Sequence, residues 1–505
     1  VDGAITFSST LNGIDILADT TNFTDSILIS QNASTGTLSS AIGNTGLGDS
    51  VFAALTSGDY NVGIGKNALT ANTTAINNTS IGSFSLATNS TGQFNTAIGY
   101  AALNQNTTAS ENVAIGGGDG SSYSGALGSN TTGAKNVAVG NGSLVANTTA
   151  SNNVAVGYNS LLVNTTGTRN NAFGSASLDA NTTASFNNAF GYNSLGANTT
   201  GEENVAMGDN AAAANTTGDK NTAIGTSSLA SNTTADNNTA LGYAALNANT
   251  TGSFNVGIGK DALLANTTAA QNTAVGGVAL AANTTGANNT GLGTSALNAN
   301  TTGSSNVAVG TNALVVNTTA DFNTAVGRDA LTANTTGAEN VAIGGNALDA
   351  NTTASFNVAI GTSALGANTT GTNNVMVGTN AGDAITTSNN NTGVGHDVLG
   401  ANTSGDLNTA MGSTALNTNT TGANNTGIGY AALTANTTGS NHVAVGTSAL
   451  GANTTGVQNT ACGDNALAAN TEGNTNAGFG IGALDANTTG SDNTACGAYA
   501  LSTAT

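Results

Sequence analysis

Histidine, cysteine and acidic side chains are the groups in this sequence that could carry out metal or nucleophilic chemistry. The two histidines, His396 and His442, have no second metal-type ligand at a typical spacing, so the sequence predicts surface positions near turns for both. No nucleophile, base and orienting group recur together. The glycine-rich stretch at 116–120 lacks the lysine and following helix of a phosphate-binding loop. The sequence therefore predicts no catalytic residue, no enzyme activity, no metal site and no cofactor.

The sequence also bears on calcium binding, glycosylation and disulfide formation. The acidic residues do not form the G-G-x-G-x-D phrase of calcium-binding β-rolls, and a Ca²⁺ ion at a turn or between chains stays an alternative. The recurring N-T-T phrase reads as a glycosylation acceptor, but an asparagine used inside a stack of coils is not accessible, so we expect no extensive glycosylation. Cys462 and Cys496 are separated by two repeats, about 10 Å in a stack, so we predict buried thiols and no intrachain disulfide.

The composition excludes several classes of partner. The chain of 505 residues has 69 glycines, no proline, 6% charged residues and a net charge of −20 with six basic residues. Binding to nucleic acid or to an anionic membrane surface needs basic clusters, which the sequence lacks. No apolar run reaches the ~18 residues of a transmembrane helix, so we expect no membrane insertion. Because the chain begins with Val1 and stops partway through a repeat, we expect a processed protein or a segment of a longer one.

A repeat of seventeen residues organises nearly the whole chain. The phrase N-x-A-x-G starts at Asn44 and recurs to Asn493 in 27 copies, with one insertion at 118–124. We number each repeat from its first asparagine, as positions 1 to 17. Residues 1–43 lie outside the repeat, and the alternation in SILIS predicts a strand in a β cap or junction. The predicted domains are this cap at 1–43 and a β-solenoid shaft at 44–505.

Each repeat position has a predicted role. The β-branched bias at position 4 predicts the inward residue of a short strand, and leucine at position 9 predicts a second inward anchor on a second strand. The glycine at position 5 of every copy predicts a positive φ or a close approach of another backbone. Asparagines at positions 1 and 12 predict hydrogen-bonded ladders along the stack. The candidate residues are the core Ile98, Leu103, Val326, Leu331, Ile343 and Leu348, the glycines Gly99, Gly327 and Gly344, and the ladder Asn323, Asn334, Asn340 and Asn351.

Two short strands and two turns per repeat predict an all-β fold, a parallel β-solenoid or β-roll. Ordering the backbone of one coil costs more conformational free energy than the burial of its two large anchors returns. Coils must therefore stabilise one another. The small residue at position 3 suggests close approach of another chain, so we expect an intertwined or side-by-side homotrimeric fibre, with a shaft on the order of 130 Å long.

Candidate contact residues lie at the turns, where the charged residues also gather. The insertion supplies a possible contact loop, and recurring aromatic residues at positions 6 and 17 either grip sugars or pack locally. The coil at 374–390 departs from the pattern at several positions and predicts a local kink. The candidate contact residues are Asp119 and Tyr123 in the loop, and Tyr100, Tyr158, Tyr192, Phe254 and Phe322 on the surface.

The repeat phrase resembles two families of fibrous protein. The phrase N-[TV]-A-[IV]-G is similar to the strand phrase in the β-roll heads of trimeric autotransporter adhesins, and NTAIGYAALNQNTTASEN from Asn95 resembles repeat shafts of tail-fibre proteins in bacteriophages and marine bacteria. The resemblance covers about 44–505. Adhesin head repeats are shorter than seventeen residues, and no coiled-coil stalk or membrane anchor is visible here. The resemblance implies a homotrimeric, extracellular attachment fibre with a host glycan or receptor as partner.

The expected function is that of a non-enzymatic extracellular structural shaft, on a virion or a cell surface, that supports attachment. Two alternatives come from other classes. One is an ice-binding or surface-templating solenoid, although adjacent threonines point to opposite faces instead of forming one T-x-T row. The other is a subunit of a polymeric extracellular filament.

Overall fold

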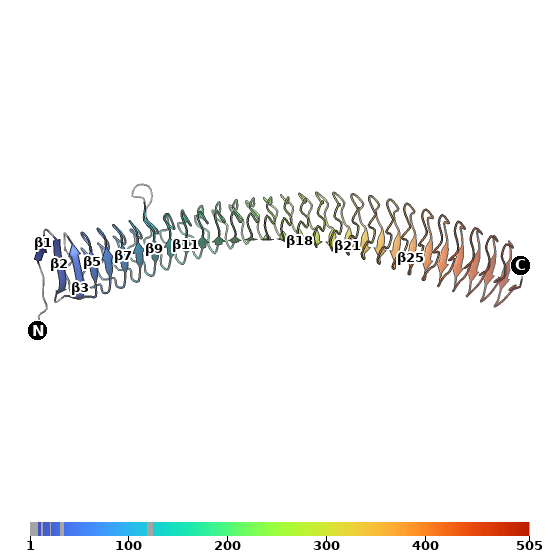
Figure 1. The fold of residues 1–505 in the computed structure, drawn as a ribbon, viewed down its shortest axis with the longest axis horizontal. Coiled ribbons are helices and arrows are strands. Elements are labelled where there is room, and N and C mark those ends of the chain that lie inside the picture. Colours follow the sequence, from blue (N-terminus) through green and yellow to red (C-terminus); the bar gives the residue numbers. More distant parts are fainter. Residues whose placement is uncertain (1–8, 12–13, 21, 31–34, 119–124, 504–505) are drawn as a thin grey trace. The chain divides into compact units, whose positions relative to one another are not determined.

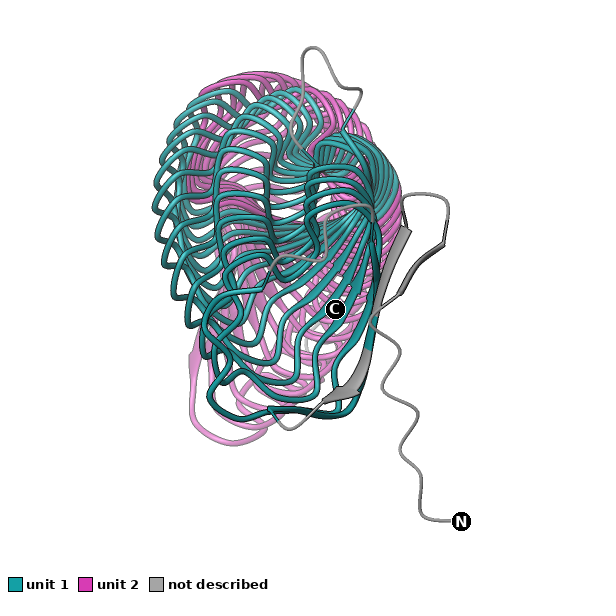
Figure 2. Cartoon of the chain, turned by 90° about the vertical axis from the view of Figure 1, so that its left-hand side faces the viewer, with its two compact units in different colours: residues 1–254 teal, residues 255–505 magenta. Residues whose placement is uncertain are grey.

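The computed structural model describes residues 9–11, 14–20, 22–30, 35–118 and 125–503, and the predicted loop residues Asp119 and Tyr123 lie outside these ranges. Within the described ranges every regular element is a β-strand (Figure 1). No helix among these residues is long and apolar enough to cross a membrane. The chain divides into two compact units, residues 1–254 and 255–505, which are coloured separately in Figure 2.

Four strands precede the repeats among the described residues. Strands β1 (Ser9–Leu11), β2 (Ile14–Thr20) and β3 (Phe23–Ser30) pair antiparallel in chain order. Strand β3 then pairs in parallel with β4 (Ala41–Ile42) and with β5 (Thr45–Leu47) of the first repeat. Residues 1–43 thus contribute antiparallel strands and a template on which the first coil continues in parallel.

Each repeat forms one coil of a parallel β-solenoid, with a three-residue strand at positions 2 to 4. The strands of successive coils pair in register, as for Thr324 with Val341, Ala325 with Ala342 and Val326 with Ile343. In the first unit the further strands are β6 (Val62–Ile64), β7 (Thr79–Ile81), β8 (Thr96–Ile98), β9 (Val113–Ile115), β10 (Val137–Val139), β11 (Val154–Val156), β12 (Asn171–Phe173), β13 (Asn188–Phe190), β14 (Val205–Met207), β15 (Thr222–Ile224) and β16 (Thr239–Leu241). In the second unit they are β17 (Val256–Ile258), β18 (Thr273–Val275), β19 (Thr290–Leu292), β20 (Val307–Val309), β21 (Thr324–Val326), β22 (Val341–Ile343), β23 (Val358–Ile360), β24 (Val375–Val377), β25 (Thr392–Val394), β26 (Thr409–Met411), β27 (Thr426–Ile428), β28 (Val443–Val445), β29 (Thr460–Cys462), β30 (Ala477–Phe479) and β31 (Thr494–Cys496).

The prediction of a second strand around position 9 is wrong. Leu331 at this position has φ 51°, and Asp329, two residues earlier, has φ 58°. Left-handed backbone at alternate residues turns the chain instead of extending it. Leu331 still hydrogen-bonds between coils, because its N–H donates to Ala347 O at 3.0 Å. Stacking thus holds in place a conformation that costs roughly 1–3 kcal/mol per residue outside such a context.

The interior of each coil is filled by positions 3, 8 and 9. Ala325, Ala330 and Leu331 are 0% exposed, as are the predicted anchors Leu103 and Leu348. The prediction that position 4 faces inward is wrong. Ile343 is 39% exposed, and Ile98 and Val326 are half-buried on the outer side of the sheet. Neighbouring strand residues point to opposite faces, so a strand of three residues with position 3 inside must place position 4 outside.

The small residue at position 3 is required by the coil's own interior. A Cβ added to Gly291 would lie 3.3 Å from Ala296 O and 3.4 Å from the Cδ1 of Leu280, the position 9 leucine of the preceding coil. The leucine therefore occupies the volume that a larger inward residue would need. Position 3 is small for this reason, and the approach of a second chain is not needed to explain it.

Glycine at position 5 is required by both backbone conformation and stacking. Gly327 has φ 137°, which lies in a region that residues with a Cβ rarely adopt. A Cβ at Gly327 would lie 2.4 Å from the carbonyl oxygen of Gly344 in the next coil. Gly99 and Gly344 have the same conformation, with φ 126° and 136°. The fifth residue of each coil therefore sets how closely the next coil can stack.

Candidate functional site

Two ladders of buried asparagine run through the coils. At position 1, Asn340 donates through its backbone N–H (3.0 Å) and its Nδ2 (3.2 Å) to Asn323 Oδ1 of the preceding coil. At position 12, Asn351 Nδ2 donates to Asn334 Oδ1 at 2.9 Å. All four side chains are 0% exposed. Each ladder therefore satisfies amide groups that would otherwise cost about 1–3 kcal/mol each when buried.

A carbonyl at position 15 joins the two ladders within one coil. Gly337 O accepts from Asn323 Nδ2 at 2.8 Å and from Asn334 Nδ2 at 2.9 Å. The threonine at position 13 adds a third link between coils, because Thr335 Oγ1 donates to Thr352 O at 3.0 Å. The asparagine of the N-T-T phrase is thus buried and bonded, which leaves no access for a glycan in the folded chain.

His442 takes the place of asparagine in the position 1 ladder, so the prediction of a surface histidine is wrong here. Its side chain is 1% exposed. Nε2 lies 2.7 Å from Gly456 O, and Nδ1 accepts from the N–H of Asn459 at 3.2 Å. Imidazole thereby reproduces one donor and one acceptor of the amide it replaces. Burial lowers the pKa of His442 to about 4.

The coil that begins at Asn374 breaks the position 12 ladder and repairs it locally. Ile385 stands where asparagine belongs, and Asn368 Oδ1 in the preceding coil has no partner. On the other side, Ser388 Oγ accepts from Nδ2 of Asn402 and of Asn391, both at 3.2 Å. Serine at position 15 thus supplies the acceptor that the isoleucine removed.

Replacing Ser388 with alanine is expected to destabilise its own and the following coil by about 1–2 kcal/mol, because two buried amides each lose one of their acceptors. Native-state hydrogen exchange of the amides between 391 and 405 measures the change. Ser404→Ala is the control, since Ser404 is exposed in the same segment. An equal loss in the two variants would contradict the assigned acceptor role.

The groups able to do chemistry do not converge in the described part of the chain. No cluster of three or more His, Cys, Asp and Glu side chains that could hold a metal ion occurs there. His396 Nδ1 lies 3.0 Å from its neighbour Asp397, and the two side chains are 60% and 33% exposed. This pair is a partly solvated turn contact.

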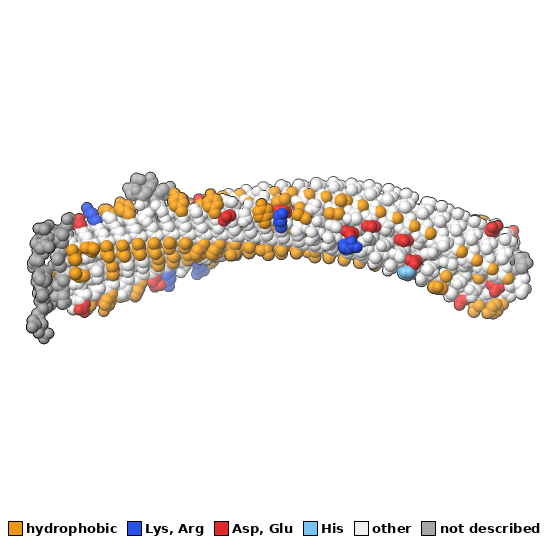
Figure 3. All heavy atoms as spheres, viewed as in Figure 1, with side chains coloured by type: hydrophobic (Ala, Val, Ile, Leu, Met, Phe, Trp, Pro, Cys, Tyr) orange, Lys and Arg blue, Asp and Glu red, His pale blue; other side chains and the backbone are white. Residues whose placement is uncertain are grey.

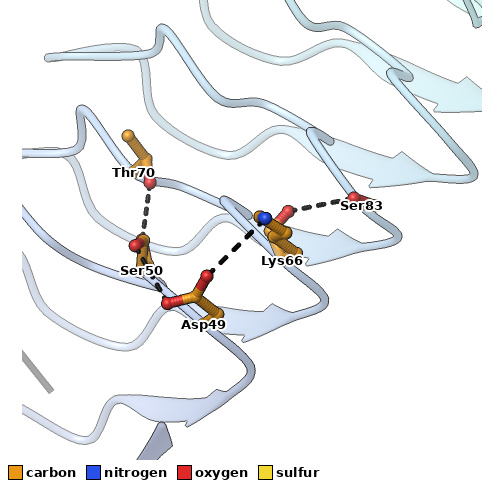
Figure 4. A network of polar contacts seen from close by, with 5 residues as sticks. All are labelled: Asp49, Ser50, Lys66, Thr70 and Ser83. Atoms are coloured by element: carbon orange, nitrogen blue, oxygen red, sulfur yellow. Dashed lines mark hydrogen bonds and ion pairs between the residues drawn. The ribbon is translucent and has the colours of Figure 1, made fainter. Parts of the chain in front are cut away.

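Charged and polar groups at the turns join successive coils by weak contacts. Lys66 Nζ lies 3.8 Å from Asp49 Oδ2, Asp49 accepts from Ser50 Oγ, and Ser83 Oγ donates to Lys66 O (Figure 4). Exposed pairs of this kind contribute about 0–1 kcal/mol. Partial burial raises the pKa of Asp349, and the nearby Asp329 carboxylate adds to the increase. The turn contacts therefore add little stability to a stack that the interior ladders already hold together.

The outer side of the strands carries a row of hydrophobic side chains. Position 4 is apolar in every coil, and no charged residue occurs at position 2 or 4 of the repeats. Phe173 and Phe190 stack on one another in this row with ring centroids 4.8 Å apart. Figure 3 shows hydrophobic side chains in rows along the coils on the face it displays. We call the outward positions 2 and 4 of the strands the sheet face.

Both cysteines lie on the sheet face, so the prediction that they are buried is wrong. Cys462 and Cys496 are free and exposed, at position 4 of β29 and β31. Phe479, on the intervening strand, pairs with both in register. The thiols follow their repeat position outward for the same geometrical reason as Ile343.

The candidate surface aromatic residues are exposed. Tyr100 is 41% exposed, Tyr158 56%, Tyr192 58%, Phe254 60% and Phe322 61%. Some aromatic residues at positions 6 and 17 have local contacts, because Tyr100 packs edge-on against Phe84, and Arg169 lies 5.2 Å from the Phe186 ring centre. They occur in scattered coils, so they form isolated contacts and not a continuous platform.

Three features of the coils were not predicted from the sequence. It placed position 4 inside because hydrophobicity was weighed without the volume already taken by the leucine at position 9. It overlooked His442 as a ladder residue, although its position 1 register was the available signal. It did not connect Ser388 with Ile385, which are the position 15 and position 12 residues of one coil.

No protein-family model matches the chain, and no curated protein matches it. The repeat geometry described above is therefore the basis on which a function is proposed.

Proposed function

We propose that this chain is a non-enzymatic, extracellular structural shaft, a homotrimeric fibre on a virion or cell surface that supports attachment to a host or other surface. The observation that carries the proposal is the continuity of the bonding between coils within each unit. The coil that begins at Asn323 is joined to the next through its strand, its two asparagine ladders and its threonine, and most described coils of each unit repeat these contacts. A stack of this kind resists local opening, because any one coil is held on both sides.

The surface chemistry also supports a mechanical role. Turn positions vary freely in residue type, while the interior positions are nearly constant. This pattern is typical of a part that must keep its geometry and has no fixed reactive site. Receptor contact, with a glycan or a protein, is assigned to exposed turn residues such as Tyr192 and Phe322 or to a neighbouring module.

Immunogold electron microscopy tests the proposal. Antibodies raised against the purified chain are applied to intact cells or particles of the source that makes it. Label on appendages outside the cell or on virions is the expected result. Label confined to the cell interior after permeabilisation would overturn the proposed function, whatever the oligomeric state of the chain.

A surface-ordering function is the second candidate, and one observation favours it. The threonines at position 14, such as Thr336 and Thr353, are exposed in successive coils, while those at position 13 are half-buried and bonded to carbonyl groups. A single row of hydroxyls about 4.8 Å apart could order water. Inhibition of ice recrystallisation by the purified chain, lost on replacing several position 14 threonines with lysine, would favour this candidate over the shaft.

A further inference from the structure

The sheet face is apolar along the coils and lies open to solvent. In the second unit its exposed position 4 side chains include Ile343 at 39%, Ile360 at 36%, Met411 at 44% and Phe479 at 45%. The residue between positions 2 and 4 is buried in each of these strands. The exposed row is therefore a fixed consequence of the strand geometry and extends from coil to coil.

The area of this row reaches the upper limit of what a soluble monomer usually exposes. Nine of its fifteen position 4 side chains, in the coils that begin between Asn255 and Asn493, are exposed and the other six are half-buried. A fully exposed aliphatic side chain offers roughly 60–120 Å² of apolar surface, so side chains about two-fifths exposed leave roughly 25–50 Å² each, or about 400–700 Å² along the row. Monomers rarely expose apolar patches above about 300–600 Å², and a stable interface buries about 800 Å² per partner.

Charge distribution separates this face from the rest of the surface. All six basic residues lie at positions 6 and 17, and the acidic residues gather mainly at the turns. Depletion of charge with a charged rim is typical of the centre of a protein interface. The same turns carry a net negative charge, so they oppose docking of an acidic partner anywhere except on the uncharged strip.

We infer that the sheet face is the surface through which copies of this chain pack against one another. A partner that covers the row must present apolar groups every ~4.8 Å along its whole length. A second copy has this period by construction, and copies whose sheet faces turn toward one shared axis repeat each favourable contact in every coil. In the homotrimer of the proposed function, three sheet faces meet around that axis.

This inference rests on the homo-oligomer of the proposed function and names its contact surface. The sequence suggested that position 3 contacts another chain, but position 3 is buried inside its own coil. The contact between chains is assigned to positions 2 and 4 instead. The native cysteines provide a probe that needs no mutation, because Cys462 lies within the row with the position 4 residues of neighbouring strands. Packing of a second copy would cover its thiol.

The test compares two charge variants by light scattering on a sizing column and by thiol reactivity. Ile360→Lys/Met411→Lys places two charges on the sheet face, three coils apart. Thr362→Lys/Ser413→Lys places the same charges at position 6 of the same coils and is the matched control. Circular dichroism establishes that both variants keep their β structure, which is expected because all four side chains are at least partly exposed.

The wild type and the control are expected at a multiple of 48.4 kDa, and the face variant at or near 48.4 kDa. Cys462 is expected to react with a maleimide roughly tenfold or more slowly in the wild type than in the face variant, because a covered thiol reacts only on opening. A wild-type monomer with a reactive Cys462 would overturn the inference. The inference would also be overturned if the face variant and the control both stayed oligomeric, because the contact between copies would then lie elsewhere. Neither outcome bears on where the protein is located.

Discussion

Acidification from pH 7 to pH 4 is expected to destabilise the coils around His442 by about 3 kcal/mol. Burial lowers the pKa of His442 to about 4 in the folded chain, against about 6.5 in the unfolded chain. Each unit of difference corresponds to 1.36 kcal/mol, so about 2.5 units give about 3 kcal/mol. Because the folded pKa is the lower one, stability is complete above pH 6.5, falls between about 6.5 and 4, and changes no further below that range.

The geometry at His442 explains why the neutral ring is required. Nδ1 accepts a hydrogen bond from the Asn459 N–H, and a proton on Nδ1 would point at that donor. The ring nitrogens contact the Gly456 carbonyl, the Asn453 amide at 3.2 Å and the backbone N–H of Asn459. None of these is an anion that could compensate an imidazolium. The ladder therefore holds one ionisable group in a place where its charge has no partner.

Hydrogen exchange of peptides covering 425–459, at pH 7 and pH 4 and corrected for intrinsic exchange, measures this effect. His442→Asn restores the amide of the other coils and is expected to remove the pH dependence of these peptides. His396→Asn, at an exposed turn, is the control and should leave it intact. A drop of the same size in the His442→Asn variant would refute the assignment to this residue.

The raised pKa values of partly buried acids act in the opposite direction. Desolvation raises the pKa of Asp383, with repulsion from Asp397 as a second cause, so its charged form is disfavoured in the folded chain. Protonation below the raised pKa relieves this cost, and the coils around Asp383 gain stability as the pH falls toward 4. Among the described residues with a shifted pKa, only His442 therefore predicts a loss of stability on acidification.

The architecture could be predicted well from the sequence because every coil must meet the same structural requirements at the same repeat positions. A glycine at position 5, such as Gly327, is needed in every coil for the stacking distance, and an asparagine at position 12, such as Asn334, is needed to bond one carbonyl group. The constancy of both positions among the repeats therefore revealed their roles. The length of the strand and the direction of its middle residue were not predictable in the same way. With only three residues per strand, hydrophobicity alone favours an inward Val326. Ala325 faces the interior instead, because Leu331 is also buried there and leaves room only for a small side chain.

Irregular coils were harder to interpret for a related reason. In the sequence, Ile385 looks like an isolated departure from the repeat. The residue that compensates for it, Ser388, has a different repeat position, and only the folded coil shows that the two act together. Met376 and Gly382 are separated by six residues, and only the structure brings the thioether over the glycine. The sheet face required the same step, since the meaning of position 4 depends on where position 3 points.

Replacing Met376 with alanine is expected to destabilise its coil by about 2–5 kcal/mol, as for other buried methionines. Met376 is 0% exposed at position 3, and Gly382 stands at position 9, where other coils have leucine. A Cβ at Gly382 would lie 3.0 Å from Met376 Cγ and 3.1 Å from its Sδ. The methionine thus fills from position 3 the volume that leucine fills from position 9 elsewhere.

The reverse change shows that the two positions share one volume. Gly382→Leu alone is expected to cost about 1–3 kcal/mol by overpacking against Met376 and Ile385. The backbone itself is ready for leucine, because Gly382 has φ 61° and Leu331 has φ 51°. The double variant Met376→Ala/Gly382→Leu should therefore be more stable than the sum of the two losses predicts by about 1 kcal/mol or more, although the contact of the new side chain with Ile385 Cδ1 remains.

Hydrogen exchange of the amides between 374 and 399 measures all three variants as a double-mutant cycle. The reciprocal exchange in a regular coil, Ala325→Met with Leu331→Gly, is the matched control, and its double variant should recover part of the loss of either single change. Additive losses in the 376–382 cycle would contradict a shared volume. Recovery at both coils would show that the interior of this solenoid is specified by the total volume at positions 3 and 9, which is the same constraint that turns position 4 outward along the sheet face.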